Sequence, residues 1–205
     1  MDKITINTQS SIRIEDKNKV IYFDPFQIEK ETHDADIIFF THDHYDHFSK
    51  KDYEKVAKDN TVYVMPKMLG NDFDNVAILL NPGNTTKIMG YHVETYRSYN
   101  IDKNYHPYEN NYLGYKLYLS DKTIYVCGDT DNIPELQNIK CDILFIPIGG
   151  KFTMDYKEAA ELTNTIKPKK VIPTHYGSIV GSKKDFNDFK KLVDKDIEVI
   201  EKIKL

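Results

Sequence analysis

The sequence predicts an α/β (α+β) domain in which a few helices cover β-sheets, and three observations lead to this fold class. Short runs rich in β-branched and aromatic residues recur along the chain, each followed by a polar turn. Only three segments carry apolar residues spaced three and four apart, as in helices. The 205 residues contain no Gly/Ser-rich linker or shift in composition, so we expect a single domain over residues 1–205. Strands interleaved with a few helices favour a layered domain with the sheets inside.

The expected strands fill most of the first half of the chain and resume after Gly114. In the first half they are Lys3–Asn7, Ser11–Glu15, Val20–Phe23, Ile37–Phe40, Thr61–Val64, Asn75–Leu79, Lys87–Met89 and His92–Tyr96. In the second half they are Tyr115–Leu119, Thr123–Cys127, Ile143–Ile146 and Lys170–Ile172. Each run is bounded by residues that favour turns.

A capping arrangement predicts the start of each helix, because Ser or Asp is followed three residues later by an acidic residue. The pairs are Ser49 with Asp52, Asp155 with Glu158, and Ser182 with Asp185. We expect the first helix to run through Lys58 and the second to stop at Pro168. The buried stripe of the third helix is expected to be Phe186, Phe189, Leu192 and Val193.

The composition indicates which binding partners and which cellular compartment to expect. The 28 basic and 32 acidic residues give a formal net charge of −4, which disfavours long nucleic acid but not a nucleotide. Cys127 and Cys141 lie in apolar stretches and are expected to be reduced core thiols. The apolar runs are too short to cross a bilayer and no signal pattern opens the chain, so we expect a cytoplasmic protein without a membrane partner. No stripe identifies an interface, and a homo-oligomer stays open.

A loop rich in metal-ligating side chains follows one of the apolar strands. Three of the seven histidines and two aspartates lie in His42-Asp43-His44-Tyr45-Asp46-His47, directly after the run that ends at Phe40. Imidazole nitrogen and carboxylate oxygen are ligands that Zn²⁺ accepts. A single His-x-His pair would more often belong to a solvated loop. Five such side chains after a buried strand favour a metal site instead.

Two further strands end in potential ligands beside small residues. Asp129 follows the strand Thr123–Cys127 in Gly128-Asp129-Thr130, and His175 follows Lys170–Ile172 in Thr174-His175-Tyr176-Gly177. Glycine permits the tight backbone turns that such loops need. Taken alone, Asp129 is more often a turn residue and His175 a hydrogen-bonded loop histidine. Their coincidence with the histidine-rich loop weakens both interpretations.

These residues resemble a known family. Thr41-His42-Asp43-His44-Tyr45-Asp46-His47 is similar to the His-x-His-x-Asp-His signature of the metallo-β-lactamase superfamily, and the Asp129 and His175 loops are similar to its Gly-Asp-Thr and terminal histidine segments. The resemblance extends from about Ile4 to Ile200. Within the superfamily, the sequence is similar to the branch that contains the ascorbate-6-phosphate lactonases and the N-acyl phosphatidylethanolamine phospholipases. It implies a four-layer αββα sandwich with a metal site at one edge, between the two sheets.

The resemblance also implies roles for the matching residues. The implied first metal site holds His42 and His44, the second holds Asp46, His47 and His175, and Asp129 bridges the two. The expected cofactor is one or two Zn²⁺ ions, with Mn²⁺ or Fe as alternatives. Asp46 and Asp129 would also be catalytic, because Asp46 can orient the nucleophile and Asp129 can hold the two ions apart.

One departure from the family concerns the first metal. A further histidine normally comes from a segment that here corresponds to 96–100 and contains none. Asn100 can fill the position with an amide oxygen, or His106 can swing in from the long loop 99–112. Water can also complete the site, or the first site is incomplete and one metal remains.

The predicted function is a metal-dependent hydrolase of a small intracellular ester, lactone, amide or phosphodiester. One alternative is a nucleotide phosphodiesterase, and another is a non-catalytic metal-binding family member such as a sensor. Candidate substrate contacts lie in the loops 99–112 and 149–155 and in Tyr176-Gly177-Ser178, and Arg97 and Lys103 are cations that could meet a phosphate. The sequence does not identify the substrate.

Overall fold

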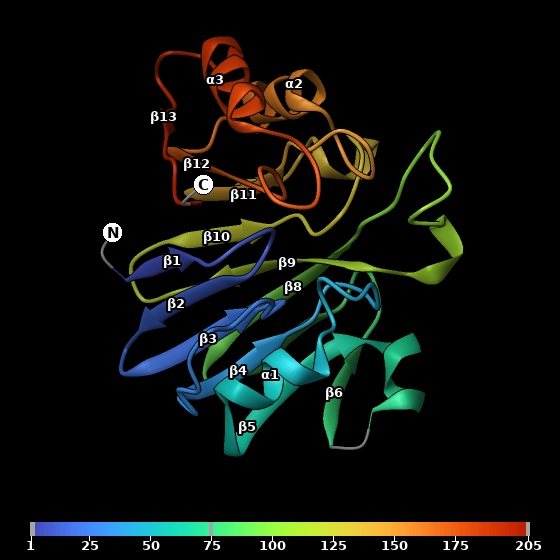
Figure 1. Cartoon of the computed structure of the whole chain (residues 1–205), viewed down its shortest axis with the longest axis vertical. Helices are drawn as coiled ribbons and strands as arrows, with labels where there is room; N and C mark the ends of the chain where they lie inside the picture. The colour runs from blue at the N-terminus through green and yellow to red at the C-terminus, as the bar shows by residue number, and fades with distance from the viewer. Residues whose placement is uncertain (1–2, 74–75, 204–205) are drawn as a thin grey trace.

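Four layers build the structure, a computed structural model that describes residues 3–73 and 76–203. Helix α1 (Lys50–Val56) lies against a first sheet, a second sheet packs on the other face of the first, and helices α2 (Tyr156–Ile166) and α3 (Lys183–Leu192) cover the second sheet (Figure 1). This arrangement confirms the predicted α/β fold class and the αββα layering. No helix within the described ranges is both long and apolar enough to cross a membrane.

The first sheet contains β1 to β6 in chain order. Its strands are β1 (Ile4–Ile6), β2 (Ile12–Asp16), β3 (Lys19–Phe23), β4 (Ala35–Phe39), β5 (Ala57–Pro66) and β6 (Ala77–Leu80). The first two pairings are antiparallel and the last three are parallel. Consequently β3 and β4 both end at the same edge of the sheet.

The second sheet has the order β13-β12-β11-β10-β9-β8-β7. Its strands are β7 (Thr85–Ile88), β8 (Tyr91–Arg97), β9 (Leu113–Tyr118), β10 (Thr123–Val126), β11 (Ile143–Pro147), β12 (Lys170–Thr174) and β13 (Glu198–Val199). The strands β10 to β13 are parallel, and the meander β7 to β10 is antiparallel. The carboxyl ends of β10 and β12 therefore share an edge, as the carboxyl ends of β3 and β4 do in the first sheet.

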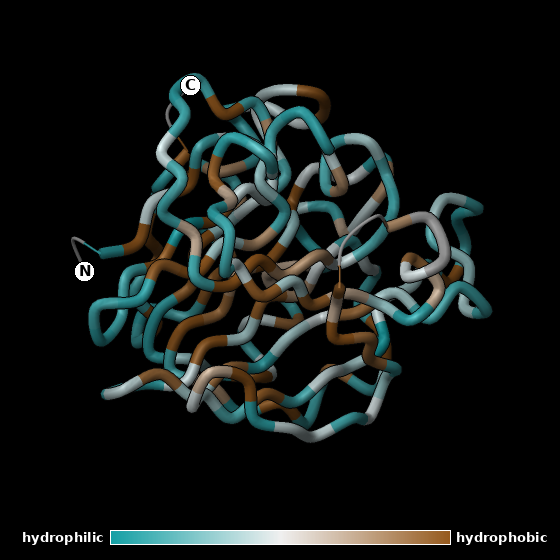
Figure 2. The backbone as a smooth tube through the Cα atoms, turned by 90° about the horizontal axis from the view of Figure 1, so that it is seen from below, coloured by the Kyte–Doolittle hydropathy of each residue, from teal (hydrophilic) through white to brown (hydrophobic). Residues whose placement is uncertain are grey.

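Alternation along β4 shows why the sheets stack in this way. Ile37 and Phe39 are buried in the main core between the two sheets, whereas Ile38 and Phe40 are buried in a second cluster with Tyr53 of α1. Successive side chains of a strand point to opposite faces, so an apolar run like this one needs a packing partner on each face. The hydrophobic segments accordingly lie in the central strands (Figure 2).

The helices follow the capping signals with two departures. Capping boxes at Asp155 and Ser182 open α2 and α3 as predicted. Helix α1 ends at Val56, before the predicted Lys58, because the chain turns extended at Ala57 and joins β5 beside β4. Leu192 was expected in the buried stripe of α3, but it lies in the last turn and is 47% exposed.

The strand predictions differ from the structure mainly at strand ends. The predicted start of one strand, Asn75, lies outside the described residues. The short 3-10 helices η1 (Lys67–Asp72), η2 (Tyr108–Asn110) and η3 (Pro134–Leu136), and the two-residue strand β13, carry no periodic signal and were not predicted. Cys127 is a buried free thiol, and Cys141 is free and half-buried.

Backbone hydrogen bonds join the loops at the shared edge of the two sheets. The Leu113 amide donates to the Thr41 carbonyl, the His175 amide donates to Gln9, and the Met154 amide donates to Thr130. Each bond joins a loop from one strand end to a loop from another. The loops that carry the predicted site residues are thus held together by the fold.

Candidate metal centre

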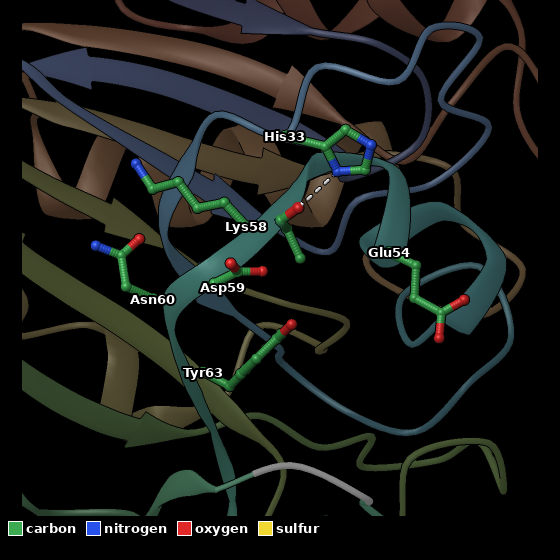
Figure 3. A pocket seen from close by; sticks show the side chains of 7 residues that line it. His33, Glu54, Lys58, Asp59, Asn60 and Tyr63 are labelled. Atoms are coloured by element: carbon green, nitrogen blue, oxygen red, sulfur yellow. Dashed lines mark hydrogen bonds between the residues drawn. The ribbon is translucent and has the colours of Figure 1, made fainter.

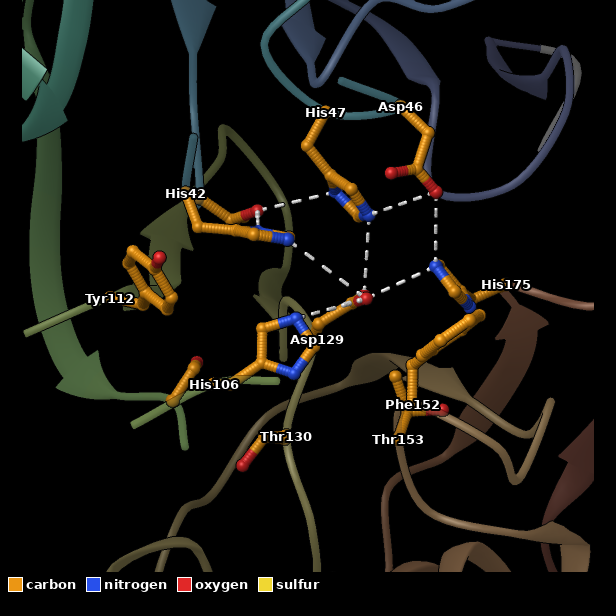
Figure 4. Close-up of polar contacts among 12 residues, drawn as sticks. His42, Asp46, His47, His106, Tyr112, Asp129, Thr130, Phe152, Thr153 and His175 are labelled. Atoms are coloured by element: carbon orange, nitrogen blue, oxygen red, sulfur yellow. Dashed lines mark hydrogen bonds and ion pairs between the residues drawn. The ribbon is translucent and has the colours of Figure 1, made fainter. Parts of the chain in front are cut away.

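The histidine-rich loop begins where β4 reaches the edge of the first sheet. His42 and His47 are 1% and 0% exposed, whereas His44 is half-buried. The His47 and Phe48 amides donate to the His44 carbonyl and close a turn that leads toward α1. His42 and His47 both face Asp129 (Figure 4), and ligand atoms of His42 and His44 lie within 4.8 Å of each other. Tyr45 is exposed.

Left-handed backbone conformations, which are uncommon in proteins, shape the loops that carry Asp129 and His175. Gly128 has φ +66°, and a Cβ there would lie 3.1 Å from the Leu113 carbonyl oxygen, so glycine allows β10 to turn sharply into Asp129. His175 itself has φ +54°, a left-handed conformation that is uncommon for residues other than glycine. Such a conformation persists only where the surroundings fix it, as they do at functional sites.

Asp129 lies at the centre of the cluster (Figure 4). Its carboxylate oxygens lie 3.4 Å from His47 Nε2, 3.0 Å from His175 Nε2 and 3.5 Å from His106 Nε2. His42 Nε2 is 4.0 Å from the same carboxylate. Asp129 therefore faces residues of both predicted sites, as the bridging role requires.

The other carboxylate, Asp46, lies beside the second predicted site. Its Oδ2 atom is 3.4 Å from His175 Nε2 and 3.8 Å from His47 Nε2. Ligand atoms of these three residues all lie within 4.8 Å of one another. The structure thus brings together all six residues predicted from the sequence.

His106 occupies the place for which the sequence left three alternatives. Ligand atoms of His42, His44 and His106 lie within 4.8 Å of one another, and His106 is fully buried. Asn100 does not point into the cluster, since its side-chain oxygen accepts hydrogen bonds from the His106 amide and from His106 Nδ1 at 3.0 and 2.9 Å. Asn100 therefore holds the His106 ring with Nε2 toward Asp129.

We expect Asn100→Ala to weaken metal binding at the first site by about 10–100-fold, the usual range for loss of a residue that orients a metal-binding histidine. Its amide nitrogen also donates to Asp131 and to the Phe152 carbonyl, so the loop loses four hydrogen bonds at once. Zinc titration with a competing chelator measures the change. Asn164→Ala is the matched control, because Asn164 also bonds two backbone groups but lies at α2. Equal affinities in both variants would contradict the role of Asn100.

The donor atoms that face the centre have no other partner. His42 Nε2, His47 Nε2, His106 Nε2, His175 Nε2 and Asp129 Oδ1 are buried and make no hydrogen bond to the described residues. A buried polar atom without a partner costs about 1–3 kcal/mol, so several of them in one place require an explanation. Imidazole and carboxylate donors that converge in this way fit a divalent metal such as zinc.

The electrostatics of the cluster keep its two carboxylates ionised and the rings of His42 and His106 neutral. Burial opposes the charged form of His47 and His175, but Asp129 raises the pKa of His47 well above its usual range and that of His175 to about 9, so a metal ion that binds there displaces protons from these two rings. Burial lowers the pKa of His106 to about 4, so its ring is neutral at neutral pH. Burial alone would raise the pKa of Asp129, but His175 and His47 hold it well below its usual range. Burial likewise opposes ionisation of Asp46, but the His175 ring 3.4 Å away brings its pKa down to about 2. Ionised carboxylates and a neutral imidazole are the forms that ligate metals.

Two residues at the centre were not predicted. Asp24, fully buried after β3, accepts from His47 Nδ1 at 2.7 Å and from the amide and hydroxyl of Thr41 at 2.8 and 2.6 Å. An acid directly after an apolar strand is the same signal that identified Asp129, so the sequence pattern could have found Asp24. Gln9, also fully buried, donates to Asp46 Oδ2 at 3.3 Å. It lies in a short polar turn that carries no such signal.

A larger hollow lies elsewhere, beside α1 and β5. It measures about 960 Å³ and is lined by His33, Glu54 and Tyr63 among others. Its His33 ring is bound to the Ala57 carbonyl, and Glu54 points away from that ring (Figure 3). The residues lining it do not include any member of the metal-ligand cluster, so size alone does not mark the functional site here.

Known proteins share both the sequence and this architecture. A family profile described as a beta-lactamase superfamily domain matches residues 3–175. UPF0173 metal-dependent hydrolases of Thermococcus onnurineus and Nanoarchaeum equitans are 32% and 33% identical, over 89% and 97% of this chain and 88% and 95% of theirs. A crystal structure from Parabacteroides distasonis, described as a metal-dependent hydrolase, has a TM-score of 0.86 at 28% identity and covers 98% of this chain and 93% of its own. The chain therefore belongs to the UPF0173 family of metal-dependent hydrolases, within the metallo-β-lactamase superfamily.

Proposed function

We propose that this chain is a cytoplasmic hydrolase that uses two zinc ions to cleave a small ester, lactone, amide or phosphodiester. The observation that carries the proposal is the set of buried, unpartnered nitrogen and oxygen atoms around Asp129. The description of the relatives as metal-dependent hydrolases supports the reaction class. Donors of this kind also accept Mn²⁺ or Fe, so zinc is the first metal to test.

In this proposal each site has three ligands of its own and shares Asp129. The first site holds His42, His44 and His106, and the second holds Asp46, His47 and His175. Histidine and carboxylate ligands without cysteine are typical of catalytic rather than closed structural zinc sites. Bound divalent ions lower the pKa of water toward neutrality and polarise the oxygen of the bond under attack.

Residues around the ligands hold the ligand side chains in fixed orientations through hydrogen bonds. Asp24 fixes His47 and Thr41, and the Thr41 hydroxyl lies 2.9 Å from His42 Nδ1, so the second nitrogen of each of these rings is occupied. Gln9 holds the Asp46 carboxylate from behind. With its pKa near 2, Asp46 is ionised at neutral pH and can orient an attacking water through a hydrogen bond.

Chelation tests this function directly. Protein treated with a chelator and dialysed should hydrolyse none of a panel of chromogenic esters, lactones and phosphodiesters, and added zinc or manganese should restore turnover of at least one. Addition of magnesium in place of zinc or manganese is the control for a non-specific effect of divalent ions, because imidazole donors suit zinc better than magnesium. Absence of turnover for every substrate class at full metal occupancy would contradict the proposal.

The non-catalytic alternative loses its main support. That alternative, a sensor with an incomplete metal site, depends on the absence of a third histidine from segment 96–100. Ligand atoms of His106 lie within 4.8 Å of those of His42 and His44, so His106 can supply the third histidine of the first site. The nucleotide phosphodiesterase alternative stays in the panel as one of its substrate classes.

A further inference from the structure

A small cavity lies directly over the metal-ligand cluster. It measures about 240 Å³, and its lining includes His44, Asp46, Asp129 and His175 of the cluster. The other lining residues are Tyr45, Tyr105, Phe152 and Ile179. A molecule in this cavity would therefore touch the ligand residues on one side and four apolar or aromatic side chains on the other.

Several apolar side chains that line the cavity are exposed to solvent, whereas a role in the folded core would bury them. Tyr45, Tyr105 and Ile179 are 67%, 44% and 38% exposed, and they come from three separate loops. The Phe152 ring packs edge-on against Tyr105, with centroids 4.7 Å apart. Large apolar side chains that gather at the surface around one cavity mark a binding site.

The two cations expected to meet a phosphate are paired with other groups, and a third, Lys151, lies beside the cavity with Nζ 4.9 Å from the centroid of the Phe152 ring. Lys103 Nζ lies 2.5 Å from Asp131, and Arg97 donates to Asn111 and to the Tyr108 carbonyl. The described residues that line the cavity include no lysine or arginine. A charged phosphate group in the cavity would have to rely on the bound metal ions to offset its lost hydration, whereas an uncharged group does not carry that cost.

Building on the proposed hydrolase function, we propose that the cavity binds an uncharged substrate with a compact apolar or aromatic group. This group would lie between Tyr45, Phe152 and Ile179, with a carbonyl at the ligand cluster, so esters, lactones and amides are favoured over phosphodiesters. The volume of about 240 Å³ lies below the usual 300–1,000 Å³ of small-molecule sites. The substrate group is therefore small.

A series of p-nitrophenyl esters tests the apolar wall. Burying one methylene can give up to about a fourfold gain, so kcat/KM of the zinc-loaded enzyme should rise about tenfold from acetate to butyrate and level off near hexanoate. Phe152→Ala and Ile179→Ala should flatten this rise through KM. Leu192→Ala, an exposed aliphatic residue on α3, is the control and should keep it. A flat series in the unchanged enzyme, or faster hydrolysis of bis-p-nitrophenyl phosphate than of any ester, would overturn the inference.

A binding measurement separates this inference from the proposed function. Ligand-observed NMR with 4-phenyl-2-butanone, which the enzyme cannot hydrolyse, should show binding that phenyl phosphate does not displace and that Phe152→Ala weakens several-fold. If this ketone binds but no ester is cleaved, the hydrolase proposal fails and the apolar site stands. If esters are cleaved but the ketone does not bind, the apolar site fails and the hydrolase proposal stands.

Discussion

Replacing Asp129 with alanine should abolish measurable hydrolysis and weaken metal binding at both sites. Loss of an outer-shell partner of a metal ligand typically costs 10–100-fold, and Asp129 faces the ligand nitrogens directly, so the loss of activity should exceed about 100-fold. Its carboxylate lies 3.0 Å from His175 and 3.5 Å from His106, on opposite sides of the cluster. Its carboxylate oxygens thus lie beside residues of both predicted sites.

Steady-state kinetics and elemental analysis of the purified variant measure both effects. Asp129→Asn keeps the shape of the side chain and separates loss of the charge from misfolding, which circular dichroism monitors. Asp121→Ala is the control, because Asp121 is an exposed acid paired with Lys122. His42→Ala should also lose turnover, and full activity in both Asp129→Ala and His42→Ala would refute the site.

Phe39→Ala should destabilise the protein by about 3–5 kcal/mol, the usual cost of removing a large aromatic side chain from a core. Phe39 is fully buried between the two sheets, with its ring 4.9 Å from the ring of Phe23 and 5.0 Å from that of Tyr115. It is also the last residue of β4, two positions before Thr41. The cavity should therefore loosen the histidine loop as well as the core.

Urea unfolding in the presence of a chelator measures this change without a contribution from bound metal. Ile78→Ala on the edge strand β6 is the control, since Ile78 is 37% exposed and should cost far less. A loss below about 1 kcal/mol for Phe39→Ala would show that the inter-sheet core is not packed around this ring.

The ligands that follow regular strands could be predicted because the sequence pattern and the spatial pattern coincide there. His42, Asp129 and His175 each come after an apolar strand, and parallel strands bring their carboxyl ends to one edge. For these three residues, a short apolar run followed by a polar turn was therefore enough to predict where the side chain lies in space. The same pattern also identifies Asp24, which directly follows β3.

His106 shows where prediction from the sequence stops. It lies in a loop between β8 and β9 without periodicity, and its place depends on Asn100, on Asp131 and on the Phe152 carbonyl, which is distant in sequence. Each of these contacts is long-range or depends on side-chain geometry, so no spacing rule predicts them. The loops 99–112 and 149–155, expected to contact the substrate, do supply Tyr105 and Phe152 to the apolar wall of the cavity. No spacing rule predicts that these two side chains meet Ile179 from a third loop.

Metal content per chain tests the central claim most directly. Protein purified without chelator and then saturated with zinc should contain about two ions per chain by elemental analysis, and His106→Ala should contain about one. This result would show two sites, with His106 completing the first. A single ion in both proteins would contradict the role of His106, and no bound metal in either after saturation would contradict the metal centre itself.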